Sequence, residues 1–240
     1  MSTLRADALV AAMAAELRDG DVVATGVASS LAVLAIAVAR ATHAPRLTYL
    51  ACVGAVEPEV QRIHASSEDL AYLGGRRGEL SIPDLFDHAR RGRIDTIFFG
   101  AAEVDAAGRS NMSATGSLER PVVKLPGVAG AAALRRWVRR PVLVMPRQTR
   151  RNLVNRVQVA STVDARPTPL LTDLGRFEVG GAGAVLRSHR PWTTVAEVTE
   201  RTGFAFTVAE DVATDAAPAE ATLEAIRALD PDNLRERLVG

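Results

Sequence analysis

The segment Phe98–Thr162 decides the fold. It begins FFGAAEVDAAGRSNMSATGS and, from Val122 to its end, reads VVKLPGVAGAAALRRWVRRPVLVMPRQTRRNLVNRVQVAST. Short apolar runs in it end at glycine-marked turns, first at Gly100 and then at the loop 126–130, which leads into a helix predicted over 131–140. Strand, glycine loop, helix and strand in this order predict a parallel α/β sheet. Ligands of such sheets bind where loops leave the carboxyl ends of the strands.

The same alternation extends to both sides of this segment. Upstream, helical spacing and apolar runs predict helices over 4–17, 31–42 and 82–89 and strands over 22–24, 47–53 and 95–99. Either Ser29 or Ser30 is a candidate N-cap of the helix 31–42. Downstream, we expect strands over 170–171, 177–179, 184–187 and 204–208 and helices over 194–201 and 218–229. The predicted fold class is α/β: an open, mostly parallel sheet with helices on both faces and a β-rich C-terminal segment, in one domain over 1–240.

Composition narrows the class of protein. The chain has 240 residues, 48% of them hydrophobic, and a formal net charge of +1. A balanced charge favours neither nucleic acid nor a membrane surface as a partner. Cys52 is the single cysteine, so no internal disulfide forms. The apolar run 31–39 is too short to span a bilayer, which needs about 20 residues. We therefore expect a cytoplasmic protein.

The ordered motifs resemble those of a known family, the β subunits of two-subunit class I CoA-transferases of the glutaconate CoA-transferase type. The chain is also similar to the β subunits of actinobacterial steroid ring-opening CoA hydrolases. The matching residues run in the right order over most of the chain: His43-Ala44-Pro45 with 47–56, Gly100-Ala101, Val104-Asp105, Gly108, Asn111, Leu125-Pro126-Gly127, Gly130-Ala131, 150–154, 172–177 and 202–204.

The resemblance implies a CoA-transferase fold and a partner. It implies an α subunit of similar fold in an α2β2 assembly, with the active site between subunits. It also implies an acyl-CoA thioester as substrate, with no bound cofactor. The candidate substrate-binding residues that it gives are Gly54, Asn111, Gly127, Gly130 and Ala131.

Cys52 is the position at which the chain departs from the family. The resemblance places the family's nucleophilic glutamate here, in the turn after a strand. A thiolate attacks thioesters but does not form the acyl anhydride that a carboxylate forms. Cys52 is therefore either a candidate nucleophile or a small buried residue left where the glutamate was lost.

Several acidic side chains are alternative catalytic groups. Glu103 follows the strand 95–99 at the ligand edge, where a carboxylate in an apolar cleft acts as an acid or base; the alternative is an exposed loop acid. Glu57 and Glu59 follow the turn at Cys52 and either replace the missing carboxylate or are solvated. Backbone N–H groups of the loop 126–130 either stabilise an oxyanion or belong to a packing turn.

Basic and metal-ligating residues are less specific. The arginines form a cluster that suits the phosphates of CoA or simply a solvated helix face: Arg135, Arg136, Arg139, Arg140, Arg147, Arg150 and Arg151. The four histidines show no metal-ligand spacing, and we predict no metal site.

Three functions remain open from the sequence. The first is CoA transfer between an acyl-CoA and a carboxylic acid, as one half of a two-subunit enzyme. The second is hydrolysis of a carbon–carbon bond in a ring-bearing CoA thioester, with the working glutamate in the α subunit. The third is a non-catalytic scaffold or regulatory subunit.

Overall fold

The computed structural model describes residues 2–239, which fall into two compact units. The first unit contains residues up to 98, residues 137–141 and residues from 217 onward; the second contains 99–136 and 142–216. The chain thus crosses between the units several times. The expectation of one domain over 1–240 stays a prediction.

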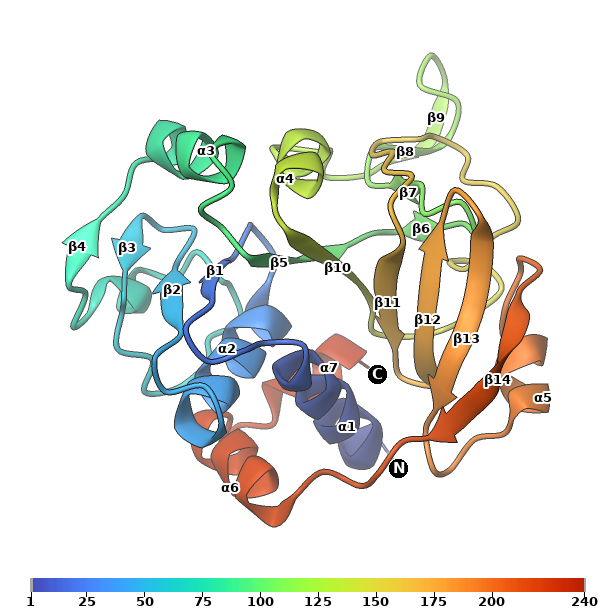
Figure 1. Ribbon diagram of the computed structural model, residues 1–240. Coiled ribbons are helices and arrows are strands. Elements are labelled where there is room, and N and C mark those ends of the chain that lie inside the picture. The colour runs from blue at the N-terminus through green and yellow to red at the C-terminus, as the bar shows by residue number, and fades with distance from the viewer. Residues whose placement is uncertain (1, 240) are drawn as a thin grey trace. The chain divides into compact units, whose positions relative to one another are not determined.

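The first unit is built on a buried helix. Residues 30–39 of α2 (Ser30–Thr42) are all buried, as expected for a helix that is apolar around its whole circumference. Figure 1 shows α2 beside α1 and α6, with α7 next to α1. The elements of this unit are α1 (Ser2–Ala15), β1 (Val22–Ala24), α2, β2 (Thr48–Leu50), β3 (Ala55–Val56), the 3-10 helix η1 (Leu70–Leu73), β4 (Gly78–Glu79), α3 (Ile82–Arg90), α6 (Glu220–Leu229) and α7 (Leu234–Val239).

The second unit is rich in strands. Its antiparallel pair β12 (Gly175–Gly180) and β13 (Gly183–His189) forms the hairpin that the glycines 180–183 predict. Phe177 on β12 packs edge-on against Phe204 and Phe206. Its other elements are β6 (Glu103–Val104), β7 (Ser110–Asn111), β8 (Ala114–Gly116), β9 (Pro121–Lys124), α4 (Ala131–Trp137), β11 (Thr168–Thr172), α5 (Val195–Glu200) and β14 (Thr207–Thr214).

The main sheet has ten strands in the order β14-β13-β12-β11-β10-β5-β1-β2-β3-β4. Its middle strands β5 (Thr96–Gly100) and β10 (Arg140–Met145) have residues in both units. The pairs β2–β1, β1–β5 and β10–β11 are parallel, whereas β2–β3, β3–β4, β11–β12 and β12–β13 are antiparallel. The predicted α/β class and open, mostly parallel sheet are confirmed. Antiparallel pairs flank the parallel centre, and the edge pair β13–β14 is parallel again.

Three local expectations were wrong. Residues 121–124 form β9 of a separate hairpin with β8, and Val122 is 82% exposed, so this run has no place in the main sheet. The helix predicted over 131–140 ends at Trp137, because the backbone N–H of Arg140 already donates to Asp95. The strand predicted over 47–53 ends at Leu50. The N-cap of α2 is Ser29, one of the two predicted candidates, although its hydroxyl donates to the carbonyl of Val27 and accepts no hydrogen bond from the helix N–H groups.

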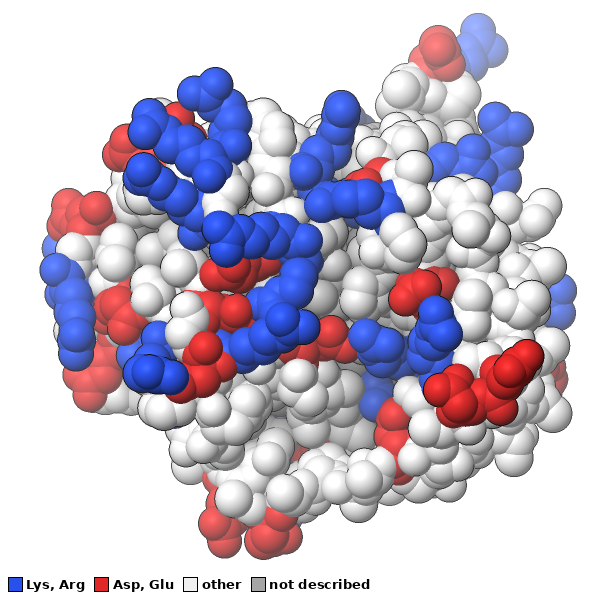
Figure 2. Space-filling view, viewed as in Figure 1, with Lys and Arg blue, Asp and Glu red and all other residues white. Residues whose placement is uncertain are grey.

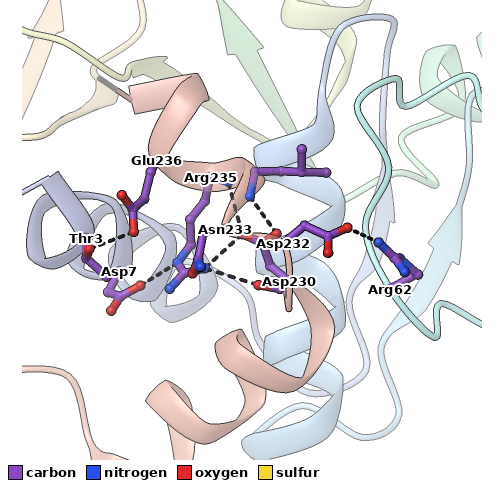
Figure 3. Close-up of polar contacts among 9 residues, drawn as sticks. Thr3, Asp7, Arg62, Asp230, Asp232, Asn233, Arg235 and Glu236 are labelled. Carbon is purple, nitrogen blue, oxygen red and sulfur yellow. Dashed lines mark hydrogen bonds and ion pairs between the residues drawn. The ribbon is translucent and has the colours of Figure 1, made fainter.

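The C-terminal helix α7 was not predicted, and a buried ionic network holds it. Arg235 donates from Nε to Oδ1 of Asp7 on α1 at 2.5 Å and from Nη1 to Oδ2 of Asp230 at 2.9 Å. The Arg235 side chain is 1% exposed. Figure 3 shows this network, together with the exposed pair of Arg62 and Asp232. The two carboxylates fasten α7 to α1 within the first unit.

Candidate functional site

Cys52 lies just beyond the carboxyl end of β2. In the parallel pair of β1 and β2, Ala24 is level with Leu50, so the residues that follow both strands share one edge of the sheet. The backbone N–H of Cys52 donates to Oγ1 of Thr25 at 3.3 Å, and Thr25 in turn lies 3.0 Å from the hydroxyl of Tyr49. Thr25 was not among the predicted site residues, although its place after the neighbouring parallel strand was a usable signal.

The thiol of Cys52 is half-buried and held by Ser67. Its Sγ donates to the backbone carbonyl of Ser67 at 3.1 Å. The Ser67 hydroxyl accepts from the N–H of Ser29 at 3.0 Å and is 3.1 Å from the carbonyl of Gly26, to which it donates. The Ser67 side chain therefore ties the acceptor of the thiol proton to the loop between β1 and α2. Nothing in the sequence near Cys52 indicated Ser67, which comes from a distant loop.

The electrostatics at Cys52 favour the neutral thiol. Burial raises the pKa of Cys52, and the nearby Glu68 carboxylate raises it further, although hydrogen bonds from Ser67 and Thr25 oppose the shift. Burial likewise raises the pKa of Tyr49. The free thiol ordinarily titrates near 9.0, so Cys52 is protonated at neutral pH. In this state the group is a proton donor and a poor nucleophile.

Residues after Cys52 have structural partners. Gly54 has φ +93°, and a Cβ there would lie 3.1 Å from the carbonyl oxygen of Leu80, so the turn requires glycine. Glu57 accepts from the N–H of Tyr49 at 2.6 Å and pairs with Arg40 at 3.1 Å. The carboxylate of Glu57 is thus engaged in holding β2 and α2, and the expectation of a solvated acid at this position was wrong.

Glu103 is buried, with 4% of its surface exposed. Its Oε2 accepts from Nδ2 of Asn111 and from the N–H of Gln158, both at 2.9 Å, and its Oε1 accepts from Nε2 of Gln158 at 2.6 Å. Both oxygens of Glu103 therefore accept hydrogen bonds from neighbouring N–H groups. The alternative of an exposed loop acid was wrong, because Gln158 closes over the carboxylate from the segment after β10.

Asn111 is fully buried. Within residues 2–239, it is the candidate binding residue that hydrogen-bonds to Glu103. The second hydrogen of its Nδ2 goes to the carbonyl of Ala114 at 2.8 Å, and its Oδ1 accepts from the N–H of Ser113 at 3.0 Å. The amide thus shapes the turn between β7 and β8.

The glycine loop precedes α4 in the second unit. Gly127 has φ +103°, and a Cβ there would meet nothing within 4 Å. Ala129 also has a positive φ, of 42°. Gly130 and Ala131 lead into the helix and are partly exposed. Space beside Gly127 and an unusual backbone at Ala129 fit a loop that accepts a ligand at its main chain.

One interpretation of the arginine cluster from the sequence was a solvated helix face. The structure does not show a single solvated face. Arg135 has no exposed surface, whereas Arg136 on the same helix is exposed. Figure 2 shows basic side chains spread over one face of the molecule, with carboxylates among them. Arg139 forms an ion pair with Asp95 at 3.0 Å. Within residues 2–239, no three histidine, cysteine or acidic side chains gather as metal ligands, and no helix is long and apolar enough to cross a membrane.

The candidate residues therefore form two groups. Cys52 and Gly54 lie in the first unit, and Glu103, Asn111 and the glycine loop lie in the second. Comparison with known proteins identifies the family to which the chain belongs. A model of the family described as coenzyme A transferase matches residues 7–201. The chain belongs to the coenzyme A transferase family.

Three relatives are informative. The chain is 35% identical over 156 residues to the B component of the 3-oxoadipate CoA-transferase of Pseudomonas knackmussii; the match spans 58% of this chain and 60% of that component. It is 27% identical over 180 residues to the cholesterol ring-cleaving hydrolase IpdB subunit of Rhodococcus jostii, spanning 68% of this chain and 70% of that relative. A crystal structure of the decarboxylase AibA/AibB matches with 62% identity and a TM-score of 0.97 over 98% of both chains.

Further crystal structures of AibA/AibB carry single replacements of one cysteine, by alanine, valine, serine or asparagine. The relatives of this chain thus include a transferase, a ring-cleaving hydrolase and a decarboxylase. Membership of the family supports an enzyme of CoA thioester chemistry and leaves the reaction to the residues of the site.

Proposed function

We propose that this chain is the β subunit of a two-subunit decarboxylase that acts on a CoA thioester bearing a free carboxylate. The observation that carries the proposal is the half-buried thiol of Cys52, which donates to the carbonyl of Ser67 at the strand end where the family resemblance expects a glutamate. The 62% identity to the decarboxylase AibA/AibB supports it over almost the whole chain. The two-component nature of that relative supports an α-subunit partner, and we keep the α2β2 assembly as part of the proposal.

Cys52 supplies the proton in this reaction. The bond between the carboxylate carbon and its neighbour breaks, CO₂ leaves, and the electron pair moves into the π system conjugated with the thioester carbonyl. The resulting carbanion takes the Cys52 proton, and water restores the thiol. This requires a carboxylate β to the carbonyl or at the vinylogous position. General acid catalysis of this kind contributes about 10²–10⁴-fold.

For the second unit by itself, we propose that the main chain of the glycine loop binds a negatively charged oxygen. Gly127, Gly130 and Ala131 remain the candidate substrate-binding residues, because main-chain N–H groups stabilise an oxyanion without reorganisation. Gly54 shapes the turn that presents the thiol. Glu103 and Asn111 enter the proposal as the pair that fixes the preceding turn, since their polar atoms are already hydrogen-bonded to each other and to Gln158.

CoA transfer is the second candidate, favoured by the family and by the 3-oxoadipate CoA-transferase relative. Transfer stores CoA on a carboxylate between two half-reactions, and Cys52 offers sulfur. Glu103 has both oxygens engaged, so the carboxylate of a transferase would come from the α subunit. The ring-cleaving hydrolase and the silent scaffold are further outcomes of the same experiment.

The test uses the two-subunit enzyme, purified after co-expression with the α-type subunit of the same genome. Carboxyl-labelled CoA thioesters of dicarboxylic acids are supplied with and without an acceptor acid. We expect labelled CO₂ without any acceptor, and a fall of about 10²–10⁴-fold in kcat for Cys52→Ala with little change in KM. CoA appearing on the acceptor without CO₂ would establish transfer. Ring cleavage of a cyclic CoA thioester with water would establish hydrolysis, and no turnover in any arm would favour the scaffold.

A control variant shows whether a change elsewhere in the same unit, with the thiol kept, affects decarboxylation. Ser81→Ala removes an N-cap of α3 in the same unit, at a distance in sequence from Cys52, and should leave decarboxylation unchanged. Deuterium from D₂O should enter the product at the carbon that lost CO₂. A Cys52→Ser enzyme that retains full kcat would refute the assignment of the proton donor.

A further inference from the structure

Arg135 is the most unusual charged residue of the second unit. Its surface is completely buried, and its Nη1 donates to Oγ1 of Thr162 at 2.9 Å. Its Nε and Nη2 are buried and have no hydrogen-bond partner among residues 2–239. A buried guanidinium with unmet donors is strongly unfavourable, because both the charge and the N–H groups have lost water.

Other buried arginines of the chain show how this cost is normally met. Arg235 has two carboxylate partners, Asp7 and Asp230. Arg190, which is 4% exposed, pairs with Asp215 at 2.7 Å. Arg135 differs from both, since no carboxylate oxygen of the described chain lies within 4 Å of it as an ion pair.

The acidic groups around Arg135 are already paired. Asp164 binds Arg166 through both oxygens, at 2.6 to 3.1 Å. Asp105 binds Nε of Arg109 at 2.8 Å and also accepts from the N–H of Arg109. Each carboxylate is thus bonded to another guanidinium, and neither is in ion-pair contact with Arg135, although both act on its charge from a longer distance. Burial lowers the pKa of Arg135 to about 10, so it still carries its proton at neutral pH.

The place beside the unpaired nitrogen is kept clear by glycine. A Cβ on Gly108, which has φ +74°, would lie 3.4 Å from Nη2 of Arg135 and 3.5 Å from the Cα of Gly180. Gly108 therefore lies directly beside the unpaired Nη2, with no side chain between them. Any larger residue at position 108 would place carbon where Nη2 needs an acceptor.

We propose that Arg135 binds an enclosed monovalent anion of the size of chloride through Nε and Nη2, next to Gly108. The anion supplies a negative charge in direct contact with Arg135 and accepts the two unmet N–H groups, which a water molecule would do without supplying a charge. Arg135 extends from α4, and its Thr162 partner lies 2.5 Å from the hydroxyl of Ser110 on β7. The bound anion therefore fixes α4, which begins at the glycine loop, against the strand that carries Asn111.

The experiment compares thermal unfolding in sodium chloride and sodium gluconate at equal ionic strength, after refolding in halide-free buffer. A ligand tenfold above its Kd raises Tm of a chain of this size by about 3–6 °C. We expect this chloride-specific rise in the wild type and in Arg136→Met, a matched exposed arginine on the same helix. Arg135→Met should show no difference between the two salts.

A second measurement does not depend on the folding of any variant. Crystals of the wild-type complex grown in bromide should show an anomalous peak in hydrogen-bonding distance of Nε and Nη2 of Arg135. Equal Tm in both salts together with no bromide peak would overturn the proposal and leave a water site. A chloride effect that persists in Arg135→Met would also overturn it, because the anion would then bind elsewhere.

Discussion

The buried network at Arg235 allows a quantitative prediction of stability. Arg235→Met removes a guanidinium that is 1% exposed and leaves Asp7 and Asp230 without it. The side chain of Asp230 has no exposed surface and that of Asp7 is 10% exposed, so water cannot replace the lost donor at either carboxylate. Breaking a buried pair by removing one partner costs about 3–5 kcal/mol.

The control is Arg227→Met, on the neighbouring helix α6. Arg227 pairs with Glu220 at 2.9 Å, but the two side chains are 57% and 66% exposed. Exposed pairs contribute about 0–1 kcal/mol. Both substitutions remove one arginine and keep a flexible apolar chain, so their difference isolates the effect of burial.

Thermal and urea unfolding of the two variants measure this difference. At about 2–4 °C per kcal/mol, Arg235→Met should lower Tm by about 6–20 °C, and Arg227→Met by no more than about 4 °C. Near-equal losses in the two variants would refute the reasoning. A double-mutant cycle with Asp7→Ala should give a coupling of about 1–3 kcal/mol between Asp7 and Arg235.

Three further predictions concern single residues. Burial raises the pKa of Cys52, so the folded state holds the thiol proton more tightly than the unfolded state does. The free energy of unfolding therefore falls as pH rises above the ordinary thiol value of 9.0. Urea midpoints of the wild type should fall relative to those of Cys52→Ala between about pH 8.5 and 10. Gly203→Ala should destabilise by about 1–3 kcal/mol in urea melts, because its Cβ would lie 2.4 Å from the carbonyl oxygen of Leu153. Ser81→Ala should lower stability by about 1 kcal/mol in the same assay, because the Ser81 hydroxyl caps α3 at the N–H of Asp84.

Elements with a strong local signal were predictable from the sequence. The apolar run in α2, Pro83 at the start of α3 and the glycines between β12 and β13 each fix structure through neighbours in the chain. The run 121–124, which forms β9, was wrongly placed in the main sheet because a short apolar run does not show which surface it contacts. The helix α7 was missed because its stability depends on Asp7, more than 220 residues earlier in the sequence.

The candidate site shows the same division. Cys52 and the glycine loop were found because the family resemblance fixes their positions in the chain. The hydrogen-bond partners of the site residues were not predictable in this way. Ser67 contacts the thiol of Cys52 and Gln158 contacts Glu103, and both come from loops that tertiary folding brings near. Burial of Arg135 was likewise invisible, since its neighbours Arg136 and Arg139 suggest an exposed basic helix.

Position 52 links these observations to the reaction. A glutamate in this turn would put a negative carboxylate beside the carbonyl oxygen of Ser67, which now accepts the thiol proton at 3.1 Å. Two acceptors in contact repel each other, so the surroundings of Cys52 suit a proton donor and not a carboxylate nucleophile. Transfer needs a group that holds CoA, whereas decarboxylation needs an acid at the carbanion. The loop at Ser67 and the thiol therefore point to the same chemistry, although they come from different parts of the sequence.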